Sequence, residues 1–159
     1  MKKTGLTPQF SMQDIDNYIM AFAEQAEEKI YITLQAAGEM FVKYARESGL
    51  YNDITGNLRS SIGYVIARDG DIEISNFEKQ NVGSEGDKGV QKATRLAMDL
   101  VTTHNVGLTL IGVAGMEYAI YVEAMESKDV ITGASMKTAE WLRKAVKAVI
   151  DKAKEDGRI

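Results

Sequence analysis

An uninterrupted helical pattern over residues 11–48 constrains the fold of this chain more than any other feature. The segment has no proline, and its single glycine is Gly38. Its apolar positions recur with a mean spacing of about 3.6 residues, the period of a straight α-helix rather than the 3.5 of a coiled coil. They are Ile15, Ile19, Phe22, Ala26, Ile30, Leu34, Ala37, Phe41 and Tyr44. We therefore expect one long helix with one side on a core.

The length of this helix sets a further condition. At a rise of 1.5 Å per residue it spans roughly 55 Å, which exceeds the diameter of a compact domain of this size. Either the helix breaks near Gly38 or one end projects. Ser11 with Asp14 predicts its start, and Gly49 predicts its end.

A β-hairpin is predicted next, because the β-rich runs 61–67 and 71–77 flank Asp69 and Gly70. With a two-residue turn, Ala67 faces Ile72 and Val65 faces Ile74. Ile62, Tyr64 and Ile66 then lie on the other side. The first strand is apolar on both faces, so either another helix of this chain or a neighbouring subunit covers the second face.

The remaining segments complete an α+β domain. A loop precedes an inserted helix at about 88–104, a strand follows at 106–114, and 116–125 fits a short helix better than a strand. A C-terminal helix is expected at about 135–156, ended by Gly157. We predict a single domain over 1–159, in which a small, mostly antiparallel sheet region at about 58–125 packs against the long, the inserted and the C-terminal helices.

Composition excludes several classes of protein. The chain has no cysteine, so we expect neither a disulfide framework nor a thiolate metal site. No run of 18 apolar residues occurs, which argues against a membrane span. The net charge of −4 argues against general nucleic-acid binding, which depends on clustered lysine and arginine.

The sequence carries no recognisable catalytic motif. The only histidine, His104, falls at the predicted end of the inserted helix, where such side chains are common. The glycine-rich stretch 83–89 lacks the Gly-Lys-Ser/Thr ending of a phosphate loop. We expect no enzyme activity, no cofactor and no metal.

The junction between the long helix and the hairpin has a recognisable order. Gly56 suits a positive φ, and Thr55 or Asn57 can cap a short helical turn. The motif consists of Thr55, Gly56, Asn57, Leu58, Arg59, Ser61 and Ile62. It resembles the tail-component family of long-tailed bacteriophages, and so does the later segment 118–123, with Tyr118, Tyr121 and Glu123. With the flanking helices, the resemblance covers most of the chain.

This resemblance implies a structural virion protein, made in the bacterial host cytoplasm. Copies would assemble as a ring at the head–tail junction or upper tail, beside neighbouring neck and tail proteins. We expect a subunit interface at Ile62, Tyr64, Ile66, Tyr118 and Tyr121, and a structural pair between Arg59 and Glu123. The alternative is a small cytoplasmic interaction module outside any virion, with the long first helix as its docking surface.

Overall fold

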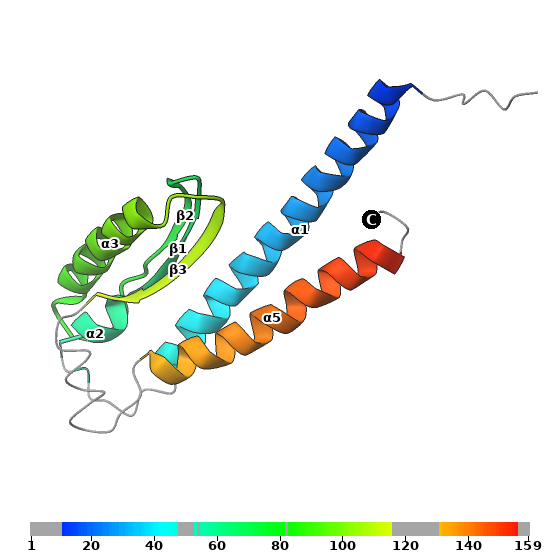
Figure 1. Ribbon diagram of the computed structural model, residues 1–159. Coiled ribbons are helices and arrows are strands. Elements are labelled where there is room, and N and C mark those ends of the chain that lie inside the picture. The colour runs from blue at the N-terminus through cyan, green and yellow to red at the C-terminus, as the bar shows by residue number, and fades with distance from the viewer. Residues whose placement is uncertain (1–10, 48–52, 54, 82, 116–130, 156–159) are drawn as a thin grey trace, which may run out of the picture.

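The computed structural model describes residues 11–47, 53, 55–81, 83–115 and 131–155 of the 159-residue chain. Its elements follow the expected α+β order (Figure 1). They are α1 (Met12–Glu47), α2 (Asn57–Ser60), β1 (Ile62–Arg68), β2 (Asp71–Asn76), α3 (Gly86–Thr103), β3 (Leu108–Ala114) and α5 (Thr132–Glu155). Residues 116–125, for which a short helix is predicted, lie outside the described residues.

Helix α1 runs without a break through Gly38, and its N-terminal end projects from the rest of the molecule (Figure 1). Its start is the predicted one. The backbone N–H of Asp14 donates to Ser11 Oγ at 3.1 Å, while the Ser11 N–H donates to Asp14 Oδ2 at 2.7 Å. This reciprocal pair satisfies amides that have no partner within the helix.

The three strands form an antiparallel sheet in the order β2-β1-β3. Asp69 (φ 50°) and Gly70 (φ 89°) make the predicted two-residue turn, because two positive φ angles match the twist of a hairpin. Ala67 pairs with Ile72 as expected. A bulge between Ile66 and Ala67 then shifts the register, so that Ile66, and not Val65, lies opposite Ile74.

Helices cover both faces of the sheet (Figure 1). On one face, α3 packs Ala93, Ala97 and Val101 onto the strands, where Val65, Ala67 and Val113 are buried. On the other face lie α1 and α5. The buried residues there are Leu34, Phe41, Val42, Ala45, Leu58, Ile62, Tyr64, Ile66 and Ala134. The second apolar face of β1 is thus covered by helices of this chain.

The buried contacts of α1 lie in its C-terminal half. The first buried residue of α1 is Leu34, and the ion pair between Glu27 and Arg68 of β1 joins the helix to the hairpin end of the sheet. Helices α1 and α5 run antiparallel beside each other, and the start of α1 extends past the end of α5 (Figure 1). None of the described helices is both long and apolar enough to cross a membrane.

Candidate interaction surface

The junction motif forms a short helical turn, α2, entered through Gly56 with φ 75°. Its cap is not the predicted Thr55 or Asn57. Instead, Asp53 accepts the backbone N–H of Leu58 at 3.2 Å and that of Arg59 at 2.8 Å. A carboxylate satisfies two free amides at once, and it adds negative charge where the helix dipole favours it.

The same turn is tied to the start of α3. The Asn57 side chain donates to Glu85 Oε2 at 3.0 Å, and the Glu85 N–H donates to the carbonyl of Thr55 at 3.0 Å. Hydrogen bonds from Lys88 and Asn57 lower the pKa of Glu85, so this carboxylate stays charged. Helix α3 approaches so closely that a Cβ atom on Gly89 would overlap the carbonyl oxygen of Asn57.

Arg46, near the end of α1, joins the junction to the sheet. Its guanidinium donates to the carbonyl oxygens of Ile62 at 2.9 Å, Glu78 at 3.3 Å and Arg59 at 3.4 Å. The motif therefore holds the end of α1, the start of β1 and the start of α3 together. Its described contacts are structural ones.

The predicted subunit interface on β1 is wrong. Ile62 and Ile66 are fully buried and Tyr64 is 3% exposed, all within the core made by α1 and α5. The pattern correctly indicated a covered face, but it could not say which element covers it. Tyr118 and Tyr121 lie outside the described residues, as does Glu123, the expected partner of Arg59.

His104 lies at the end of α3, which is its predicted position. Its Nδ1 lies 3.0 Å from the carbonyl oxygen of Leu100 and 2.9 Å from Thr103 Oγ1. The glycine-rich stretch contains the start of α3, at Gly86. Within the described ranges, no group of three or more histidine, cysteine, aspartate or glutamate side chains could hold a metal ion.

A run of exposed apolar side chains lies on residues 12–26 of α1, here called the arm. Three successive side chains are largely exposed: Tyr18 at 60%, Ile19 at 56% and Met20 at 62%. Successive residues of an α-helix point about 100° apart, so apolar groups occur on several sides of the arm. Nine of the fifteen residues of the arm are apolar. The arm therefore exposes a substantial apolar surface on the part of α1 that extends beyond the sheet.

The charged side chains of the arm are all acidic. The arm carries Asp14, Asp16 and Glu24, and has neither lysine nor arginine. The sequence held a signal for this surface, since the run 18–23 is apolar at every position and one core-facing stripe does not need so many apolar residues. Ile19 belongs to the apolar stripe expected to face a core, yet it is exposed, because this end of α1 extends beyond the sheet.

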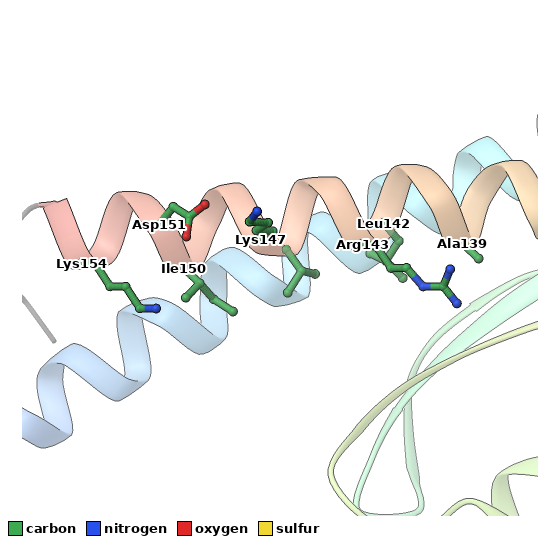
Figure 2. A pocket seen from close by; sticks show the side chains of 8 residues that line it. Ala139, Leu142, Arg143, Lys147, Ile150, Asp151 and Lys154 are labelled. Atoms are coloured by element: carbon green, nitrogen blue, oxygen red, sulfur yellow. The ribbon is translucent and has the colours of Figure 1, made fainter.

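A second surface of related character is a shallow groove of about 600 Å³ along α5 (Figure 2). Ala139, Leu142, Val146 and Ile150 give it an apolar floor at helical spacing. Arg143, Lys147 and Lys154 line it together with a single acid, Asp151. All its lining residues belong to α5, and Figure 2 shows α1 running behind that helix.

Comparisons of the chain with protein-family models, with curated proteins and with solved structures gave no match. The fold and its surfaces define an α+β domain with helices on both faces of its sheet and a projecting helical arm.

Proposed function

We propose that the protein is a structural subunit of a phage or prophage virion, which assembles as a ring at the head–tail junction or upper tail. The observation that carries this proposal is the arm. The sheet already has helices on both faces, yet the chain still exposes Tyr18, Ile19 and Met20 on a projecting helix. Exposed apolar surface of this kind marks a site of protein contact.

The resemblance to phage tail components supports the choice of assembly. The motif at Thr55–Ile62 lies at the place where three elements meet, which is a position that a shared fold has to keep. On this proposal the partners are further copies of the chain and the neighbouring neck and tail proteins. The protein is made in the host cytoplasm and ends in the virion.

On this proposal the contacts between ring subunits lie on the helices and not on strand β1. Strand β1 has no free face, since α3 covers one side and α1 with α5 covers the other. A subunit in a ring needs two different surfaces, one for each neighbour. The arm and the α5 groove are two such surfaces.

The alternative is a small cytoplasmic interaction module outside any virion. The arm favours this candidate as well, because the exposed surface lies on the long first helix that this alternative assigns to docking. The two candidates differ in whether the protein is incorporated into a particle.

Electron microscopy of induced lysates tests the proposal, with the gene deleted and with the deletion complemented. Filled heads and tails that accumulate unjoined establish a joining role, and defective tails establish tail completion. Normal infectious particles from the deletion strain contradict the virion proposal and leave the interaction module in its place. The complemented strain controls for effects on neighbouring genes.

A further inference from the structure

We propose that the arm of one copy lies in the α5 groove of the next copy, so that the chain associates with itself head to tail. This inference rests on the proposed function, for which it names the contact between ring subunits. Its occupant is a second copy of this chain, and three properties of the two surfaces support that choice.

The first property is size. The arm covers residues 12–26 and the groove covers 139–154, so at 1.5 Å per residue each is about 20 Å long. Both are single helices. Two helices of matched length can pack along their whole contact by fitting the side chains of one between those of the other.

The second property is complementary apolar surface. The arm presents large side chains, among them Tyr18, Ile19 and Met20. The groove has a floor of small and medium side chains, such as Ala139 and Val146, and Ile150 there is still 39% exposed. Contact between the two surfaces removes this apolar area from water, which favours association.

The third property is charge. The three ionised side chains of the arm are all acidic, whereas the groove has three basic side chains and one acidic one. Two arms would repel each other, and so would two grooves. Electrostatic attraction arises only between the unlike surfaces, which favours the arm-to-groove contact over arm-to-arm and groove-to-groove contacts.

A contact between unlike surfaces has a structural consequence. Each copy uses its arm toward one neighbour and its groove toward the other, which is a heterologous contact. Such contacts close into a ring or continue as a filament, depending on the rotation between copies. A ring is the form that the proposed function requires.

Disulfide cross-linking of the full chain tests the contact directly, because the protein has no cysteine of its own. Met20→Cys places a thiol on the arm, and Lys147→Cys places one on the groove. Under mild oxidation, a mixture of the two variants is expected to give a cross-linked dimer that neither variant gives alone. Met98→Cys on α3, exposed to a similar degree at 54%, is the matched control and is expected to stay monomeric with either partner.

Charge reversal gives a second and independent readout. Asp16→Lys with Glu24→Lys reverses the arm, and Arg143→Glu with Lys147→Glu reverses the groove. Each reversed surface is expected to weaken self-association by about tenfold, measured by sedimentation, because like-charge repulsion replaces attraction across the contact. Combining both reversals in one chain is expected to restore association, since the surfaces are again of opposite sign.

Several outcomes overturn the inference. Dimers from Met20→Cys alone show arm-to-arm pairing, and cross-linking of that thiol to another virion protein shows a different occupant. A lack of mixed dimers together with unchanged association of both reversed variants also refutes it. In each of these cases a ring can still form through other surfaces, so the deletion experiment decides the proposed function separately. If the deletion strain gives normal particles while the two cysteine variants still cross-link, the proposed function is refuted. The contact between arm and groove then still stands.

Discussion

The backbone of Gly38 in α1 lies against the ring of Tyr64 in β1, so that a Cβ atom at residue 38 would come within 2.5 Å of Tyr64 Cδ2. The ring is held in place by its hydroxyl, which donates to Glu39 Oε1 at 2.8 Å. Gly38 therefore allows the long helix to approach the sheet closely, and it does not break the helix. The absence of a side chain is what this packing requires.

Replacing Gly38 with valine is expected to lower the free energy of unfolding by about 2 kcal/mol, because the added side chain overpacks a buried site. Denaturation by urea measures the loss. Ala36→Val, on an exposed position of the same helix, is the matched control and is expected to change stability by less than about 1 kcal/mol. Equal effects of the two substitutions would show that helix propensity, and not contact with Tyr64, sets the result.

Because the hydroxyl of Tyr64 is buried, we expect the free energy of unfolding to depend on pH in the alkaline range. Burial, followed by the hydrogen bond to Glu39, raises the pKa of Tyr64 from 10.0 to about 12. Between these values the unfolded chain loses the proton first, so the free energy of unfolding falls as the pH rises, by roughly 2 kcal/mol at pH 12. Below pH 10 this contribution is fully present.

Tyr64→Phe is expected to remove that part of the pH dependence, at a cost of about 1 kcal/mol at neutral pH for the lost hydrogen bond. Because lysines also titrate above pH 10, the measured quantity is the difference between variant and parent in denaturation at pH 7 and pH 11. Tyr18→Phe, on the exposed arm, should alter neither value. If Tyr64→Phe keeps the same pH dependence as the parent, other titrating groups cause it.

The sequence predicts the elements of this fold well, because each is specified locally. The 3.6-residue period places α1, and Asp69 with Gly70 places the hairpin. The bulge between Ile66 and Ala67 was not predictable, since the residues around it suit a regular strand equally well. The helices that pack on Ile62, Tyr64 and Ile66 could not be predicted either. Periodicity shows that a face of a strand is buried, but it does not identify the element that buries it. The length of α1 allowed either a break or a projecting end, and the folded chain shows that its N-terminal end projects.

Asp53 gives a test of the junction. Since its carboxylate accepts two backbone amides of α2, Asp53→Ala is expected to destabilise the protein by about 1 kcal/mol. Asp53→Asn keeps an oxygen that can accept one of these bonds, and it should lose less. Thermal unfolding of the three proteins measures the series. An alanine variant as stable as the parent would show that the turn is held mainly by its packing on α3.

Two isoleucine substitutions separate the core from the arm. Ile66 is fully buried, so Ile66→Asp places a charge in the core and is expected to unfold the chain. Ile19 is 56% exposed, so Ile19→Asp is expected to leave the fold intact and to reduce self-association. Circular dichroism reports the first property and light scattering the second. A folded Ile19→Asp protein that associates like the parent contradicts a binding role for the arm.

The N-terminal cap of α1 links local stability to assembly. Ser11 and Asp14 bond to each other's backbone amides, and the bonds from Ser11 lower the pKa of Asp14 below its ordinary value of 3.8. The cap is thus fully formed above that pH, and it is lost as the pH falls through the lowered pKa. Ser11→Ala is expected to speed amide hydrogen exchange in the first turns of the arm several-fold at neutral pH, because a lost cap costs a helix about 1 kcal/mol.

Global unfolding of Ser11→Ala should match that of the parent, since the first buried residue of α1 is Leu34, far from the cap. Self-association should weaken, because a frayed arm must be ordered again when it binds. Thr102→Ala, which removes an exposed hydroxyl from the last turn of α3, is the control and should leave exchange in the arm unchanged. Faster exchange in the arm with undiminished association would show that the first turns of α1 take no part in the contact.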